Sequence, residues 1–371
     1  MIEHEPQETK DARFERVAEE IRGAGYRLHA KRHDVGGEDP KIYHTSEHPR
    51  ALDARSEEMM ETLGTSPRER SLVRMAIAWH DTTIQYDLSD QENSLATIRR
   101  HRGARIGDTP DGENGNEGQS ARDLEKEMRE ANAASQEEVF SEEDIRTAMW
   151  AIEATYPDAK LGKDFRGMPF KEYPYYEVAV QRNPEIKVFL EKLEADGIDK
   201  GPLFLQPHLE EPLEAGLKVP KEVLIVALAD LGAAGTEEYP TFAKEGDQEM
   251  RELYANLRNP SVFSELTSAD GEAGQKNREA AAKAFLGWLE SQSAFAVFQA
   301  LRFEKVIHLL RKNEEITEEQ ELGLRKQFSH FEENAKIAAQ RSKELKAEYE
   351  EKRMSLGEKA AFSRLAQELG Y

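Results

Sequence analysis

Two segments of the sequence contain the residue types that bind metal ions. The first carries His44 and His48, and in the second the apolar run Met75–Trp79 ends in His80 and Asp81. Burying an adjacent imidazole and carboxylate is costly unless their polar groups are compensated. A divalent cation supplies that compensation. The second segment therefore predicts half of a mixed nitrogen and oxygen metal site, although a polar pair that only closes a helix end is the alternative.

A third carboxylate also follows an apolar run. Asp230 ends the segment Val223–Ala229, whose composition is typical of a helix interior that would not accommodate an unpaired charge. Pro49 is tolerated only in the first turn of a helix, so we expect Ser46 to be the N-cap and His48 to lie at the helix start. His44 then lies in the preceding loop, and both imidazoles can point into one cleft.

The order His48, His80-Asp81, Asp230 resembles the HD superfamily of metal-dependent phosphohydrolases. The segment Tyr43–His48 resembles the Tyr-His-Asn-x-x-His segment of the cyclic-nucleotide phosphodiesterases. Glu92–Ala96 is similar to the segment that follows the His-Asp helix in uncharacterised bacterial HD proteins. The likeness covers residues 40–100 and 220–300, roughly, and it implies a helical core.

The resemblance implies one divalent metal ion, which could be Mn, Mg, Fe, Co, Ni or Zn. One ion is expected because the residues after Asp81 lack the further histidine with which the phosphodiesterases help to bridge a second metal. The resemblance also implies the catalytic residues Asp81, His44 and Asp53. His44 would donate a proton to the leaving group, and Asp53 would orient an imidazole. The implied metal ligands are His48, His80, Asp81 and Asp230.

The same resemblance implies hydrolysis of a phosphomonoester or phosphodiester by a metal-activated water. The substrate would be a nucleotide or another small phosphate ester. We expect its phosphate and remaining groups to contact residues near the motifs, although the arginines among them could equally be solvated surface charges. These candidate substrate-binding residues are Arg50, Tyr86, Glu92 and Arg99.

Two other functions are compatible with the motifs. A catalytically degenerate HD domain would serve as a nucleotide sensor or interaction scaffold. An HD-fold oxygenase with two irons would need additional histidines, which are not evident in the sequence.

The composition of the chain argues against nucleic acid and membranes as partners. The 371 residues include 51 basic and 73 acidic side chains, a formal net charge of -22, which would repel double-stranded nucleic acid and an anionic membrane. The absence of cysteine excludes disulfides and thiolate metal sites. No apolar stretch has the length of a membrane span, so we expect a cytoplasmic protein.

Apolar residues recur with helical spacing along most of the chain, which predicts an all-α fold. With the resemblance, this favours an HD-domain-like helical bundle with additional helices. We expect a catalytic domain over residues 1–312, with an inserted segment at about 101–220 that begins with a Gly-rich and Asn-rich surface loop between His101 and Ser120.

The C-terminal part, residues 313–371, is predicted to be a long amphipathic helical extension. It follows a strongly apolar segment, Ala280–Leu310, that indicates a buried helix or helix pair. We expect the extension to lie on its own domain, and the alternative is an intermolecular coiled coil that forms a homodimer. Its apolar stripe has alternating spacings of four and three and consists of Leu324, Phe328, Phe331, Ala335, Ala338, Ser342, Leu345 and Tyr349.

Overall fold

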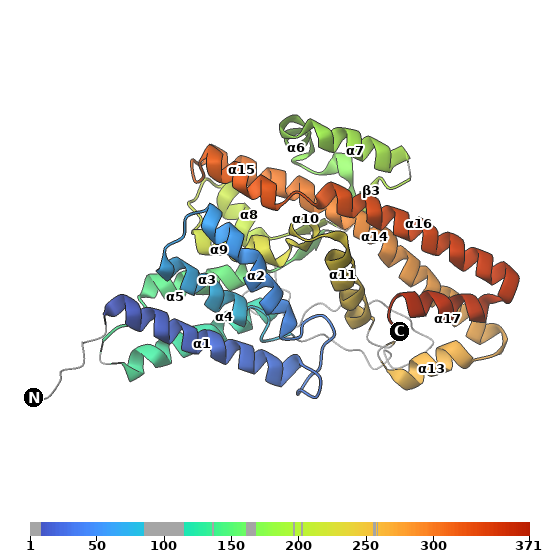
Figure 1. Ribbon diagram of the computed structural model, residues 1–371, viewed down its shortest axis with the longest axis horizontal. Coiled ribbons are helices and arrows are strands. Elements are labelled where there is room, and N and C mark those ends of the chain that lie inside the picture. The colour runs from blue at the N-terminus through green and yellow to red at the C-terminus, as the bar shows by residue number, and fades with distance from the viewer. Residues whose placement is uncertain are drawn as a thin grey trace, which may run out of the picture.

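The computed structural model describes residues 9–84, 115–135, 137–160, 168–195, 197–201, 203–254, 257 and 259–371. Within these ranges the chain is predominantly helical (Figure 1), which confirms the prediction of an all-α fold. None of the helices in these ranges is both long and apolar enough to cross a membrane. The helices are α1 (Lys10–His33), α2 (Glu47–Thr62), α3 (Pro67–Trp79), α4 (Asn116–Ala134), α5 (Glu142–Glu153), α6 (Tyr176–Arg182), α7 (Pro184–Ala195), α8 (Pro207–Glu214), α9 (Lys221–Asp230), α10 (Ala233–Thr236), α11 (Tyr239–Leu253), α13 (Pro260–Ser268), α14 (Gly271–Lys312), α15 (Glu318–Gln327), α16 (Phe331–Leu356) and α17 (Glu358–Glu368).

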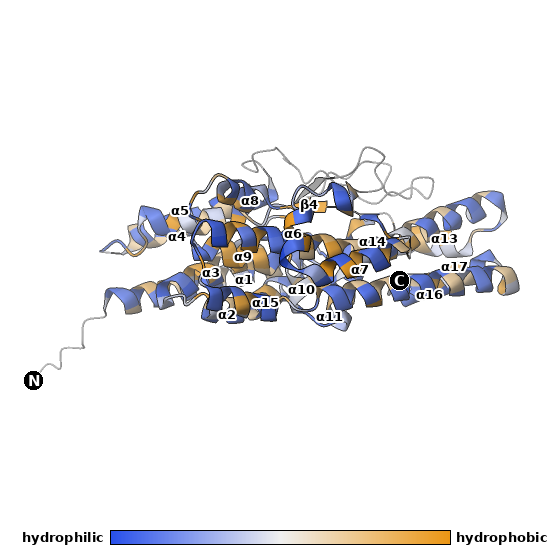
Figure 2. Cartoon of the chain, turned by 90° about the horizontal axis from the view of Figure 1, so that it is seen from above, coloured by the Kyte–Doolittle hydropathy of each residue, from blue (hydrophilic) through white to orange (hydrophobic). Residues whose placement is uncertain are grey.

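The first half of the chain packs around two apolar helices, α3 and α9. Helix α3 contacts α1, α2, α4, α5 and α9, and α9 contacts α2, α5 and α8. Every residue of the run Val223–Ala229 in α9 is buried. Figure 2 shows α9 largely in the orange of apolar residues, whereas α16 is largely blue. The apolar runs recognised in the sequence are therefore the centre of this helical assembly.

A glycine lets α1 lie directly against the end of α3. A Cβ atom at Gly25 would stand 2.7 Å from the Trp79 ring and 2.8 Å from the carbonyl oxygen of Ala78. Any larger residue would force the two helices apart. This close approach holds α1 against the C-terminal end of α3, next to His80.

The apolar segment Ala280–Leu310 lies within one helix of 42 residues, α14, so the alternative of a helix pair is wrong. Helix α16 packs along α14, and α17 packs on both (Figure 1). Except for the partly buried Leu345, all residues of the predicted C-terminal stripe are buried within the chain itself. The stripe therefore packs within the chain, but the expected long helix is divided into α15, α16 and α17.

The apolar residues form two clusters rather than one. The larger includes residues of α2, α3 and α9 and extends to Phe303 and Phe328, whose rings stack with centroids 4.7 Å apart. The smaller lies where α13, α14 and α17 meet, and there Phe285 stacks on Tyr371 at 5.1 Å. The segment after residue 312 thus contributes side chains to both clusters.

The predicted insertion contains the strands of the described fold. Two antiparallel pairs occur, β1 (Asp158–Lys160) with β4 (Leu203–Leu205) and β2 (Met168–Pro169) with β3 (Lys200–Gly201). The surface loop predicted up to Ser120 is wrong at its end, because α4 begins at Asn116. Asn116 and Ser120 are 2% and 0% exposed, so packing overrides their low helix propensity. The rest of that predicted loop lies outside the described residues.

Candidate metal centre

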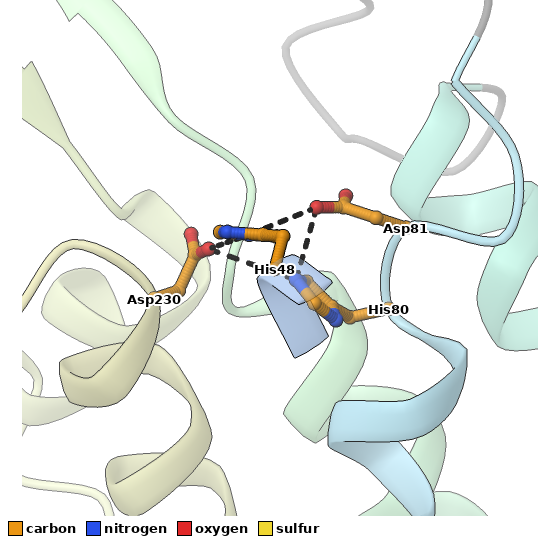
Figure 3. Close-up of side chains that lie close together, drawn as sticks. All are labelled: His48, His80, Asp81 and Asp230. Atoms are coloured by element: carbon orange, nitrogen blue, oxygen red, sulfur yellow. Dashed lines mark ion pairs between the residues drawn. The ribbon is translucent and has the colours of Figure 1, made fainter. Parts of the chain in front are cut away.

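Three packed helices bring the four predicted ligands together. His48 is the second residue of α2, His80 and Asp81 directly follow α3, and Asp230 is the last residue of α9. Each of these helices contacts the other two. Figure 3 shows the four side chains pointing toward one another from these elements. Residues far apart in the sequence therefore share one site.

The distances within this group match the ligand set of a single cation. One ligand atom from each side chain lies within 4.8 Å of all the others. Asp81 Oδ2 lies 2.9 Å from His80 Nε2 and 3.3 Å from His48 Nε2. Asp230 Oδ1 lies 3.7 Å from His80 Nε2 and 3.6 Å from His48 Nε2. Two ligands bonded to one cation at about 2.1 Å stand roughly 3.0 to 4.2 Å apart, depending on the bond angle.

The hydrogen bonds of the imidazoles also fit a cation. His48 and His80 are 5% and 1% exposed, and Nε2 of each is buried without a hydrogen-bond partner among the described residues. His80 Nδ1 lies 2.7 Å from the carbonyl oxygen of Ile77. A carbonyl can only accept, so Nδ1 carries the ring hydrogen and the lone pair of Nε2 faces the carboxylates. The group His48, His80, Asp81 and Asp230 can therefore hold a metal ion.

The charges around His48 favour a positive charge at the centre. Burial alone would lower the pKa of His48, but the neighbouring carboxylates of Asp230 and Asp81 raise it to about 9. Burial alone would raise the pKa of Asp81, but the neighbouring imidazoles of His80 and His48 hold it well below its ordinary value. Without a cation, a proton on His48 therefore offsets part of the negative charge.

Metal binding is expected to release this proton. A metal needs the lone pair of neutral His48, while below a pKa of about 9 this imidazole is protonated in the metal-free protein. The apparent affinity for Mn²⁺ should therefore rise about tenfold per pH unit between roughly pH 6 and 8 and level off near pH 9. Calorimetric titration in buffers of different ionisation enthalpy measures the protons released. Binding that is independent of pH would contradict this competition.

The sequence matches no protein-family model and no curated protein, and no solved structure matches the chain. The capacity of these four residues to hold a metal ion is therefore inferred from their own geometry. The likeness to HD phosphohydrolases therefore rests on the sequence motifs alone.

The structure does not bring Asp53 to the metal centre. Its Oδ2 pairs instead with an Nη atom of Arg22 on α1. His48 and Asp53 are five residues apart on α2, so their side chains leave the helix about 140° apart. The sequence-based role for Asp53, orienting an imidazole, is therefore wrong, because its contacts lie on another face of the helix.

Arg50 also lies away from the centre. Its guanidinium stacks over the ring of Tyr26 at 4.9 Å, its side chain is 58% exposed, and its ion pair is with Glu47 at 4.0 Å. The expected contact with the substrate phosphate is thus unsupported for this arginine. The remaining candidate substrate residues, Tyr86, Glu92 and Arg99, lie outside the described residues.

Ser46 occupies the N-cap position of α2, as predicted, but its side chain does not cap the helix. Helix α2 begins at Glu47 and has Pro49 in its first turn, as expected, but the Ser46 side chain makes no capping hydrogen bond. Its Oγ and backbone N–H donate to the two carboxylate oxygens of Asp34, at 2.8 Å and 2.7 Å. This contact joins the start of α2 to the residue that directly follows α1, and so holds the loop that carries His44.

A residue that sequence reasoning missed holds His44 in place. Glu252 on α11 is fully buried, and its Oε1 lies 2.5 Å from His44 Nδ1. Its Oε2 accepts the backbone N–H groups of Ile42, Tyr43 and His44, at 2.9, 2.8 and 3.1 Å. Because a carboxylate accepts, His44 Nδ1 donates to Glu252 and Nε2 is turned toward the centre, 3.8 Å from Asp81 Oδ2.

Proposed function

We propose that this protein is a metal-dependent phosphohydrolase of the HD type, which hydrolyses a small phosphate ester. The observation that carries the proposal is the convergence of two imidazoles and two carboxylates on one point, in the order the motif requires. The placement of His44 also supports it, because a further buried imidazole lies beside the same point.

A bound divalent cation would supply Lewis-acid chemistry, which lowers the pKa of a water and offsets charge on the phosphoryl group. His48, His80, Asp81 and Asp230 would hold it. Hydrolysis joins the oxygen of one water to phosphorus and breaks the bond between phosphorus and the leaving oxygen. In the proposed reaction His44 donates the proton of its Nε2 to that leaving oxygen, and the water supplies the proton that restores the imidazolium.

Glu252 is the proposed positioning residue for this proton transfer. It binds both the Nδ1–H of His44 and the backbone of the loop that carries it. These contacts would prevent the His44 ring from flipping or moving away, so that its Nε2 stays turned toward the metal centre. In this proposal His44 and Glu252 serve proton donation, whereas the four candidate ligands bind the cation.

The direct test measures phosphate release from a panel of phosphate esters, using protein stripped by a chelator and reloaded with Mn²⁺, Mg²⁺, Co²⁺ or Ni²⁺. The proposal predicts release that depends on added metal and disappears again with chelator. No release from any ester with any of these ions would contradict it. Retained metal without turnover would favour the alternative of a degenerate domain that acts as a sensor or scaffold.

The variant Glu252→Gln tests the positioning role. We expect kcat for an alkyl phosphate to fall by about tenfold to a hundredfold, with KM and metal affinity within about twofold, since partners behind a reacting histidine have effects of this order. The double variant with His44→Ala should be no slower than His44→Ala alone, because Glu252 acts through that ring. Glu238→Gln, at an exposed position just before α11, is the matched control. Additive losses in the double variant would show that Glu252 acts elsewhere.

A further inference from the structure

A buried histidine on α1 has polar atoms that the proposed reaction does not use. His29 is 0% exposed, and neither of its ring nitrogens has a hydrogen-bond partner among the described residues. His33, one turn further along α1, has its ring nitrogens beside the carbonyl oxygens of Asp39 and Thr82, at 3.1 Å and 3.2 Å. Most buried polar groups are bonded to protein or to water, because leaving them unpaired costs free energy. The imidazole of His29 therefore has capacity for a ligand that the chain does not supply.

The neighbours of His29 on α1 place it beside the metal centre. Gly25, His29 and His33 follow one another at intervals of four residues, so they lie along one face of the helix. A Cβ atom at Gly25 would stand 2.8 Å from the carbonyl oxygen of Ala78. His33 Nε2 lies 3.2 Å from the carbonyl oxygen of Thr82. His29 lies between these two contacts, and so faces the residues between Ala78 and Thr82, which include two of the four candidate ligands.

The electrostatic surroundings of His29 agree with this placement. Burial is the largest influence on its pKa and lowers it to about 2, so the ring is neutral at neutral pH. Among the groups whose charge also acts on this pKa are Asp81, His80 and His48. A neutral imidazole has one N–H donor and one lone pair. His29 can therefore bond a water molecule beside the metal centre without adding positive charge to it.

We propose that His29 binds the water molecule that attacks phosphorus, with one ring nitrogen accepting a hydrogen bond from that water. This inference rests on the proposed function, which assigns the reacting phosphate to the metal centre. The same bonds form and break as in the hydrolysis described above, and the proton of the water still restores the imidazolium of His44. His29 fixes the direction from which the water oxygen approaches phosphorus.

The variants His29→Leu and His29→Gln test this role. Leucine has a similar size but no polar side-chain atom, so kcat for an alkyl phosphate should fall at least about tenfold while the bound Mn²⁺ per chain stays the same. The Tm of the metal-free protein should stay the same or rise, because the substitution removes an unpaired buried polar group. Glutamine retains a donor and an acceptor, and His29→Gln should keep more turnover than His29→Leu. Equal turnover in the two variants, or loss of Mn²⁺ in His29→Leu, would overturn the assignment.

Ile21→Val is the matched control on the same face of α1. Ile21 is 5% exposed and lies two turns before His29. Loss of a buried methyl group should lower Tm, whereas kcat of the Mn²⁺-loaded protein should stay within about twofold. The two positions thus have opposite expected effects on stability and turnover. A loss of kcat in Ile21→Val as large as that in His29→Leu would show that turnover responds to the packing of α1, and would overturn the role of the imidazole.

A high-resolution crystal structure of the Mn²⁺-loaded protein tests the contact itself. It should show a water oxygen within about 2.7 to 3.2 Å of a ring nitrogen of His29. A second manganese ion bound to His29, or a ring without any partner, would overturn the proposal. This water without turnover of any ester would reject the hydrolase and keep the water site at His29. Turnover without this water would reject the role of His29 and keep the hydrolase.

Discussion

The variant Asp81→Ala is expected to lose both metal and turnover. Asp81 Oδ2 is the carboxylate oxygen nearest to both imidazole nitrogens, at 2.9 Å and 3.3 Å. Its removal should weaken Mn²⁺ binding by at least about a hundredfold, since even partners outside the ligand set account for tenfold to a hundredfold. Phosphate release should fall to the background rate. Equilibrium dialysis followed by elemental analysis measures the first effect.

Asp53→Ala is the matched control for this substitution. It removes the same side chain from a partly buried position, but the ion pair that it breaks is with Arg22. We expect a modest loss of thermal stability and full retention of metal. Loss of metal in Asp53→Ala but not in Asp81→Ala would reverse the assignment of the two aspartates.

The variant His44→Ala is expected to keep the metal and lose most turnover. His44 faces the centre at 3.8 Å from Asp81 Oδ2, and it is outside the four-residue group. For an alkyl phosphate, kcat should fall by about a hundredfold to ten thousandfold, the usual range for general acids. Metal content should stay near that of the unchanged protein.

The leaving group separates proton donation from a structural effect. The p-nitrophenolate ion leaves without a proton, so His44→Ala should slow p-nitrophenyl phosphate far less than an alkyl phosphate. His44→Asn retains a side chain that can donate to Glu252, and it should show the same contrast. Equal losses for both esters, or loss of metal, would assign His44 to metal binding or to folding.

The candidate ligands could be predicted because the sequence places charged or polar residues directly after apolar runs that are expected to be buried. His80-Asp81 and Asp230 each end an apolar helix, and the residues before them are buried in the structure. Pro49 fixes the start of α2, so the position of His48 could also be inferred. The convergence of the three helix ends is a tertiary property, and only the order of the motif suggested it.

The incorrect predictions concern residues whose contacts depend on the side of α2 from which their side chains project. Asp53 and Arg50 are near His48 in the sequence, but on α2 they point to other faces and contact residues of α1. Proximity in the sequence is a poor guide within one helical turn, since each residue rotates the side chain by about 100°.

Glu252 could not be inferred from its neighbours. It lies in a helix rich in Glu, Lys and Asp, a pattern typical of a solvated surface. It is buried because the loop Ile42–His44 folds over it and directs three backbone N–H groups at one carboxylate oxygen. Backbone donors leave no trace in residue types, so only the three-dimensional structure shows this contact.

The C-terminal helices were predicted in type and in the face that they bury. The stripe from Leu324 to Tyr349 packs against α14 and neighbouring helices. The break between Gln327 and Phe331 was missed because the stripe continues through it with unchanged spacing. Hydrophobic periodicity thus identified the buried face but not the boundary.

Anomalous diffraction from crystals grown with Mn²⁺ tests whether the four side chains share one cation. We expect one strong manganese peak per chain, within about 2.0 to 2.4 Å of His48 Nε2, His80 Nε2, Asp81 Oδ2 and Asp230 Oδ1. A peak that excludes Asp230 or either imidazole, or no peak at this point under saturating Mn²⁺, would contradict it.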